Sequence, residues 1–344
     1  MPLPVDDDDA GAVVLALTCA VLLAFAYRSA SFATPVADDG APLPSYLKYK
    51  EKFLMPVRDQ RCCAACWSFS VADMMADTLN AQTAGAFGKR PLSAQYLLSC
   101  SSAHRGCEVG GSPEDVYDLP QLTDAGCPLD ADLPYEGKET PCRPLPPDVL
   151  RVRTVPNTAV SLCDDPDRAL PGTRAATIRR NVRNMKRALL QYGPIVGTLR
   201  VTGDLYAYRG DGIFRGDPAS KFYGYHAVEI VGWCDENVNW AEPGFDGAYW
   251  IVRSSWGFDW GVPKGMRYGW AYVTMGENCA DIESRASVCR VEFPMALEEV
   301  RRRTPTSAAR YESYEHYVDD PERENFIGGL KTALGANSKA FRRT

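Results

Sequence analysis

The chain has 344 residues, a length that allows one large domain or two lobes around substantial cores. Hydrophobic residues make up 45% of it and charged residues 24%, which are the proportions of an ordinary globular protein. The net charge is −6 and the sequence has no long basic stripe. The composition therefore excludes an electrostatic footprint for nucleic-acid binding.

Twelve cysteines accompany only three histidines. This ratio argues against a large zinc framework, and we expect no metal and no cofactor. Disulfides explain most of the cysteines better, which favours an oxidising compartment. The sequence contains no Asn-x-Ser/Thr triplet, so sorting to lysosomes through N-linked glycans is not expected.

The N-terminus combines four aspartates with an uncharged run over residues 10–27, closed by Arg28. We interpret residues 1–28 as an uncleaved single-pass membrane anchor, with a cleaved signal peptide as the alternative. The basic residues on the C-terminal side of the anchor predict that the rest of the chain is cytoplasmic, whereas the cysteine content predicts that it lies in an oxidising compartment. The sequence therefore leaves open on which side of the membrane the rest of the chain lies. Residues 29–42 are rich in Pro, Ala and Asp and indicate a linker.

The body is predicted to span residues 43–294 and to have an α+β fold. A helix is expected from Cys66, with Phe69, Ala72, Met75 and Leu79 spaced along one side. The second half contains four segments of strand composition, GPIVGTLRV, YHAVEIVGW, AYWIVRSSW and RYGWAYVTM. A helical lobe followed by a β-rich lobe is therefore expected. Residues 295–344 indicate a polar C-terminal tail.

Two residues near the predicted helix suggest nucleophilic catalysis. A helix N-terminus lowers the pKa of a thiol, so Cys66 stands where a reactive thiolate could form. Gln60 lies six residues earlier, where its amide could donate to an oxyanion beside the Cys66 backbone N–H. A single cysteine at a helix start is more often a packing residue or a half-cystine, so the surrounding sequence must decide.

That surrounding sequence resembles the papain family of cysteine peptidases. PVRDQRCCAACWSFS resembles the signature around the nucleophile of the family, and LLSCSSAHRGCEVGG resembles its Cys/Gly-rich stretch. Further along, DLYAYRGDGIF, GYHAVEIVGW and YWIVRSSWGFDWG are similar to later family motifs in the same order. The resemblance covers residues 43–294 and implies a two-lobed fold with a helical left lobe and a β-barrel-like right lobe.

The resemblance also implies roles for individual residues. Cys66 would be the nucleophile, His226 the general base and Gln60 the oxyanion donor, with Trp256 over the Cys-His pair and Gly110 and Gly111 along the substrate cleft. The implied disulfides are Cys63–Cys107 and Cys100–Cys142. The sequence leaves open the pairing of Cys62, Cys127, Cys163, Cys234, Cys279 and Cys289.

Two departures from the family pattern bear on activity. Ser254 stands where the family has the asparagine that orients the histidine, and Arg61 stands in place of a glycine. A hydroxyl can accept the imidazole N–H but is shorter than a carboxamide, so we expect a working peptidase with a weakened third member. The alternative is a catalytically impaired pseudoenzyme that acts as a peptide-binding or structural membrane protein.

The C-terminal part of the domain favours the cathepsin B-like branch. GENCADIESRASVCRVEFP resembles the end of that branch and places Arg285 at the base of the S2 pocket, where it would select an acidic substrate residue. The alternative is that Arg285 points to solvent. The resemblance to this branch implies an occluding loop with two histidines, which makes its members trim dipeptides from C-termini. No such loop occurs between Cys107 and Cys142, so endopeptidase action is favoured. We expect a monomer acting on proteins or peptides, with a viral origin and a virion or host endomembrane location as a hypothesis.

Overall fold

The computed structural model describes residues 40–102, 104, 106–210, 212–236, 245–258, 260–261, 269–292 and 311–313. The predicted anchor, most of the linker and most of the tail lie outside these residues. Within the described part of the chain, no helix is both long enough and apolar enough to cross a membrane. Residues Val36–Thr344 form one compact unit.

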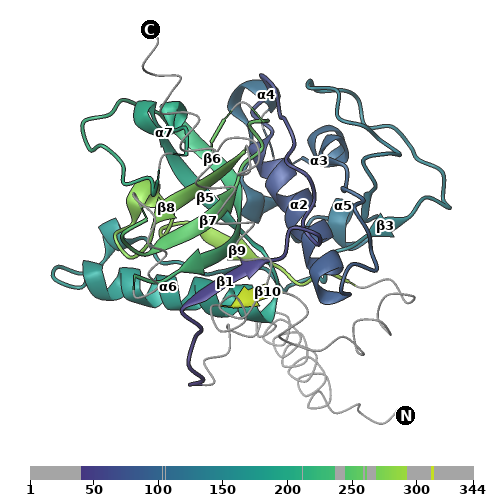
Figure 1. Ribbon diagram of the computed structural model, residues 1–344. Helices are drawn as coiled ribbons and strands as arrows, with labels where there is room; N and C mark the ends of the chain where they lie inside the picture. The colour runs from purple at the N-terminus through teal and green to yellow at the C-terminus, as the bar shows by residue number, and fades with distance from the viewer. Residues whose placement is uncertain are drawn as a thin grey trace, which may run out of the picture. The chain divides into compact units, whose positions relative to one another are not determined.

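The first half of the unit is mainly helical (Figure 1). It contains β1 (Tyr46–Tyr49), α2 (Cys66–Gln82), α3 (Ala94–Cys100), α4 (Gly106–Val109), the 3₁₀ turn η1 (Pro113–Asp115), α5 (Pro120–Thr123), β2 (Cys127–Pro128) and β3 (Arg151–Val152). The helix α3 begins at a capping serine, since the Ser93 hydroxyl accepts a hydrogen bond from the Tyr96 backbone N–H. The short strands β2 and β3 pair only with each other.

The second half supplies most of a larger sheet. It contains β4 (Val160–Ser161), η2 (Pro166–Arg168), α6 (Arg174–Gln191), β5 (Ile195–Thr202), α7 (Gly203–Ala207), β6 (Phe222–Cys234), β7 (Tyr249–Arg253), β8 (Trp270–Thr274), η3 (Cys279–Asp281) and β9 (Ala286–Val288). The strands run in the order β10-β1-β6-β5-β9-β4, where β10 is Tyr311–Ser313, and β7 joins β6 to β8. All these pairings are antiparallel. Helices followed by an antiparallel sheet are an α+β arrangement.

Strand β6 is the centre of this sheet because it is long enough to pair with three neighbours. Its N-terminal half pairs with β5, and its C-terminal half pairs with β1 and β7. The register shifts at Val201/Thr202 in the pairing of β6 with β5, and between Ile230 and Gly232 in the pairing of β6 with β7. Such irregularities bend a strand and increase its twist, which lets β6 leave one partner and meet others. All four predicted strand segments fall on β5, β6, β7 and β8, and this prediction is confirmed.

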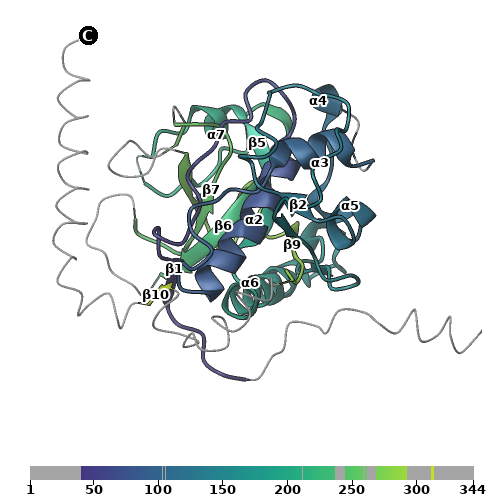
Figure 2. The ribbon, with the colours of Figure 1, turned by 90° about the vertical axis from the view of Figure 1, so that its right-hand side faces the viewer.

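Helix α2 is the central element of the helical half, and it packs against β6 (Figure 2). It begins at Cys66, as the sequence predicts. The expectation of a single apolar side is too narrow, since every residue from Trp67 to Gln82 is buried. Small residues such as Ala72 and Ala76 let neighbouring elements approach closely, and a helix enclosed on all sides needs no polar face. The helix is thereby fixed between the sheet and the other helices.

The described part of the predicted tail is the short strand β10 (Tyr311–Ser313). It pairs with β1 in antiparallel register, so that Leu47 faces Ser313 and Tyr49 faces Tyr311. These three residues therefore extend the sheet beyond β1.

Candidate active site

Cys66 is the first residue of α2 and lies beside the segment that carries His226. Burial raises the pKa of the Cys66 thiol, while backbone hydrogen bonds from Ala227, Trp67 and Cys66 itself lower it. Ala227 follows His226 directly on β6, so these hydrogen bonds place the sulfur next to the histidine segment. The helix N-terminus adds a favourable field for a thiolate. The surroundings thus provide polar support for an anion inside an otherwise desolvated site.

His226 is buried and held by two neighbours. Its Nε2 lies 2.9 Å from the Ser254 Oγ, and its ring stacks on Trp256 with centroids 4.1 Å apart. With Nε2 engaged by Ser254, the ring can present Nδ1 to the thiol. Burial lowers the pKa of His226 to about 3, so an imidazolium here depends on a nearby anion.

Ser254 therefore lies at hydrogen-bond distance from the imidazole without any bridging group. The Trp256 backbone N–H donates to the same hydroxyl oxygen at 3.3 Å, and the Ser254 N–H donates to the Gly269 carbonyl. The side chain of Trp256 also meets Trp260 edge-on, with centroids 4.8 Å apart. These contacts shield the His226–Ser254 pair from water, which strengthens a hydrogen bond.

Gln60 has a fixed side-chain orientation. Its Nε2 donates to the Cys63 carbonyl at 2.9 Å, and its Oε1 accepts from the Ser255 hydroxyl at 2.7 Å. The Tyr135 hydroxyl donates to the Gln60 carbonyl at 2.8 Å. An amide nitrogen carries two hydrogens, so the second remains for a substrate oxygen.

The backbone at Arg61 adopts the left-handed conformation that a glycine would take, with φ of 54°. A non-glycine residue there costs about 1–2 kcal/mol. Two contacts offset part of this cost, because Arg61 N–H donates to the Asp59 carboxylate at 2.7 Å and the guanidinium donates to the Glu136 carbonyl at 3.3 Å. The glycine that Arg61 replaces in the family pattern would adopt this conformation without that cost.

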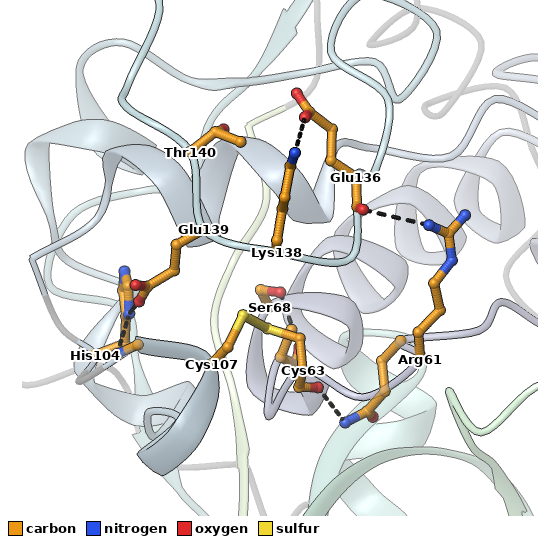
Figure 3. The surroundings of a disulfide bond; sticks show 12 residues. Arg61, Cys63, Ser68, His104, Cys107, Glu136, Lys138, Glu139 and Thr140 are labelled. Carbon is orange, nitrogen blue, oxygen red and sulfur yellow. Dashed lines mark hydrogen bonds and ion pairs between the residues drawn. A yellow bond between two sulfur atoms is a disulfide. The ribbon is translucent and has the colours of Figure 1, made fainter.

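Two disulfides flank the site, Cys63–Cys107 and Cys100–Cys142. They are the two pairs that the family resemblance implies. The first joins the segment before α2 to α4, and Figure 3 shows it with Arg61 and His104 on either side.

The remaining described cysteines correct one expectation. The two disulfides take up four of the twelve cysteines and six of the described ones are free, so disulfides do not account for most of them. The free ones are Cys62, Cys66, Cys127, Cys163, Cys279 and Cys289. Of these, Cys127, Cys279 and Cys289 are buried and behave as small apolar core residues.

Gly110 and Gly111 lie beside a cavity of about 460 Å³. Gly110 has φ of 78°, and a Cβ on it would lie 2.7 Å from the Ala64 carbonyl oxygen. Only glycine fits that close approach to the segment preceding Cys66. His104, which stacks on Trp67 at 5.1 Å between ring centroids, also lines this cavity.

Arg285, expected at the base of the S2 pocket, is instead exposed, as in the solvent-facing alternative. Its guanidinium lies over the Tyr225 ring at 4.5 Å. The residue precedes β9, which pairs with β5 and β4, and its carbonyl accepts from the Thr198 N–H. A charged group that stacks on an exposed ring keeps its hydration while its stem packs.

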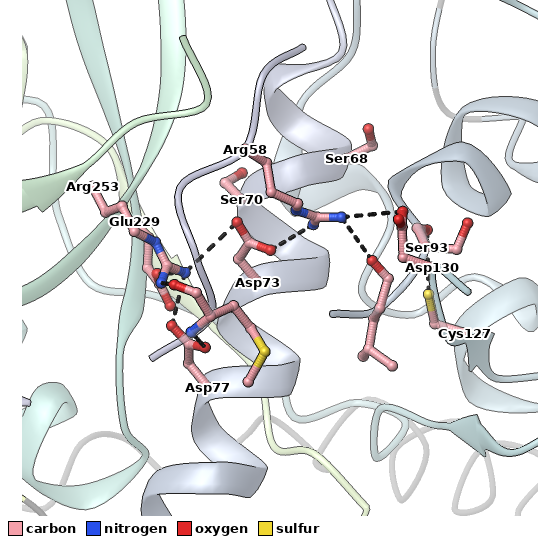
Figure 4. Close-up of polar contacts among 12 residues, drawn as sticks. Arg58, Ser68, Ser70, Asp73, Asp77, Ser93, Cys127, Asp130, Glu229 and Arg253 are labelled. Carbon is pink, nitrogen blue, oxygen red and sulfur yellow. Dashed lines mark hydrogen bonds and ion pairs between the residues drawn. The ribbon is translucent and has the colours of Figure 1, made fainter. Parts of the chain in front are cut away.

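Sequence reasoning missed a buried ionic cluster close to these residues. Arg253, immediately before Ser254, lies among carboxyl groups of α2 and β6 (Figure 4). The available signal was the presence of Asp73 and Asp77 one turn apart on the helix of Cys66, together with Glu229 in an otherwise apolar strand. Charges in segments that must be buried require partners.

Comparison with known proteins decides the family. The profile of the papain family cysteine protease matches residues 43–290. The chain belongs to the papain family. Mouse cathepsin O is 31% identical over 252 residues, which cover 72% of this chain and 68% of that protein. Mouse cathepsin J is 27% identical over 223 residues and is matched over 58% of its own length and 64% of this chain.

The fold of this family member agrees with solved structures. The procathepsin B S9 of Trypanosoma congolense superposes with a TM-score of 0.58 at 23% sequence identity, over 77% of this chain and 85% of that one. At this identity the likeness establishes the papain-like fold alone. The cathepsin B-like branch therefore rests on the sequence motifs and not on this comparison.

Proposed function

We propose that this papain-family protein is a cysteine endopeptidase. The Cys66 thiolate would attack the scissile carbonyl carbon, and the imidazolium of His226 would give its proton to the leaving amine. Water would then hydrolyse the acyl-enzyme, with His226 as the base. Gln60 Nε2 and the Cys66 N–H would hold the oxyanion, a role in which one donor is typically worth about 10²–10³ in kcat.

The orientation of His226 is the observation that carries this proposal. Its Nε2 is engaged by Ser254 at 2.9 Å beneath Trp256, while the next residue on β6 contacts the sulfur of Cys66. Burial disfavours a lone thiolate or a lone imidazolium, whereas formation of both together gives each an opposite charge. A thiolate–imidazolium pair is therefore the charged state that this site supports best.

We further propose that the cleft prefers acidic side chains and belongs to a cathepsin B-like enzyme without a His-His loop. Two arginines on the β5/β9 side support this preference. Arg285 stacks on Tyr225 and Arg200 stacks on Phe222 at 4.7 Å, and the two rings are 5.4 Å apart. Within the described residues neither guanidinium has a carboxylate within ion-pair distance, although the charges of both act on the pKa of Asp281, so both can bind a further carboxylate.

The membrane anchor over residues 10–27, the monomeric state and a virion or endomembrane location remain proposals from the sequence. Flotation of the full chain with liposomes, compared with residues 41–344, tests the anchor. Failure of the full chain to float with the liposomes would contradict it.

Hydrolysis of a mixed peptide library by the full chain tests the function, with Cys66→Ala as the control and Ser254→Asn alongside. We expect cleavage within peptides that disappears with Cys66→Ala and increases with Ser254→Asn. Undiminished cleavage by Cys66→Ala would contradict the proposal, and a folded wild-type protein that cleaves nothing would instead indicate the peptide-binding pseudoenzyme.

A further inference from the structure

A single buried guanidinium connects the three elements that carry the proposed catalytic residues. Arg253 ends β7, immediately before Ser254, and faces Glu229 across the β6/β7 pairing. Its Nη2 contacts the Glu229 carboxyl and lies 2.7 Å from Asp77 Oδ2 and 3.6 Å from Asp73 Oδ2 on α2. Its Nη1 donates to the Met55 carbonyl. One side chain thus joins α2, β6 and β7 at one point (Figure 4).

This cluster lies in the core. Arg253 and Glu229 are each 2% exposed and Asp77 is fully buried. Around it, Arg58 contacts Asp73 at 2.5 Å and the partly exposed Asp130 at 3.4 Å. Nearer the surface, the exposed Lys89 donates to the Glu51 and Leu54 carbonyls. Buried charges of this kind are stable only when they are balanced.

The balance depends on a proton. The largely buried cations are Arg58 and Arg253, whereas three buried carboxyl groups face them, on Asp73, Asp77 and Glu229. Two carboxylates and one neutral carboxyl group match these two cations. Lys89 and Asp130 reach solvent, which screens their charges.

Glu229 is the group that keeps the proton. Burial raises its pKa well above the usual range, although Arg253 opposes this and the charges of Asp77 and Asp73 raise it further. Burial raises the pKa of Asp77 only to about 6, because Arg253 and the Met55 N–H stabilise its carboxylate. Near neutral pH, Asp77 is therefore the carboxylate and Glu229 the neutral carboxyl group.

We infer that Arg253 and protonated Glu229 are positioning residues, which hold Cys66, His226 and Ser254 in register and release them when Glu229 ionises. His226 lies three residues before Glu229 on β6, and Cys66 begins the helix that carries Asp73 and Asp77. Ionised Glu229 would put an unbalanced charge between α2 and β6, and separation of these elements moves the thiol from the imidazole. The inference rests on the proposed peptidase function, and it names a control on that site.

The test compares kcat and KM separately between pH 5 and pH 10 in the wild type, Glu229→Gln and Arg253→Lys. Glu229→Gln keeps this side chain neutral at every pH, so we expect the alkaline midpoint of kcat to rise by about one pH unit or more, with KM unchanged. Arg253→Lys keeps the charge but shortens the reach, and we expect kcat to fall about 10-fold or more, again with little change in KM. Glu292→Gln, in the exposed pair with Arg153, is the matched surface control.

Two further measurements separate this inference from the proposed function. The pH profile of Cys66 alkylation by iodoacetamide gives the same comparison without turnover, so a protein that cleaves no peptide still tests the inference. Thermal unfolding at each pH shows whether a variant is folded, and if Arg253→Lys is not, the Glu229→Gln profile decides. Alkaline midpoints that coincide in the wild type, Glu229→Gln and Glu292→Gln would overturn the inference.

Discussion

Replacement of Ser254 by alanine removes one oxygen atom and one contact with the imidazole. The lost contact is the 2.9 Å hydrogen bond to His226 Nε2, in a site where Ser254 is 4% exposed and water cannot easily replace the hydroxyl. A hydrogen bond to a charged group is worth about 1.5–3 kcal/mol. At about 1.4 kcal/mol per factor of ten, kcat should fall about 10- to 100-fold. KM should change little, because the hydroxyl contacts the histidine and not the substrate.

Steady-state hydrolysis of a fluorogenic peptide measures this effect, and Ser287→Ala is a matched control. Ser287 is equally buried and has one side-chain hydrogen bond, at 3.1 Å to the Tyr117 hydroxyl, but it lies outside the site. Both substitutions should lower stability to a similar extent, and only Ser254→Ala should lower kcat. A fall in kcat below about threefold, or an equal fall in Ser287→Ala, would refute a role for Ser254 in orienting the imidazole.

Three further predictions concern stability. Replacing Cys63 and Cys107 by alanine opens a crosslink over a separation of 44 residues and should cost about 4 kcal/mol in the free energy of unfolding, measured by urea denaturation; an unchanged midpoint would contradict this. Arg61→Gly should relieve the left-handed backbone and leave the unfolding midpoint unchanged or higher, whereas Arg61→Ala should lower it. In Cys66→Ala, His226 is neutral in the fold down to about pH 3 but takes up a proton near pH 6.5 when unfolded, so acidification to pH 5 should lower the free energy of unfolding by about 2 kcal/mol. A further His226→Gln change should abolish that loss. Equal losses with and without His226→Gln would exclude His226 as its source.

The sequence predicts the elements whose signals are local. The start of α2 at Cys66 follows from the composition around it, and β5 to β8 follow from runs of strand-forming residues between turn signals. The roles of Gln60, Cys66 and His226 could be predicted because a family motif surrounds each of them. The structure adds that β5, β6 and α2 lie together, so that these motifs meet.

Features that depend on packing between distant segments were not predictable in the same way. The three-way pairing of β6 and the cluster around Arg253 both arise from residues far apart in the chain. The buried position expected for Arg285 failed because stacking on Tyr225 leaves its charge in solvent. The cysteine count suggested disulfides, yet a buried thiol is also an ordinary small core residue. Composition alone does not distinguish these outcomes.

The reactivity of Cys66 relative to Cys62 tests the central claim most directly. Cys62 is exposed and Cys66 only partly so, which means that access alone would favour labelling of Cys62. A peptidyl epoxide added to the full chain, with labelled sites mapped by mass spectrometry over time, reports which thiol is activated. We predict that Cys66 is labelled first and that His226→Ala abolishes this preference. Labelling of Cys62 with Cys66 unmodified in the folded protein would contradict a thiolate–imidazolium peptidase.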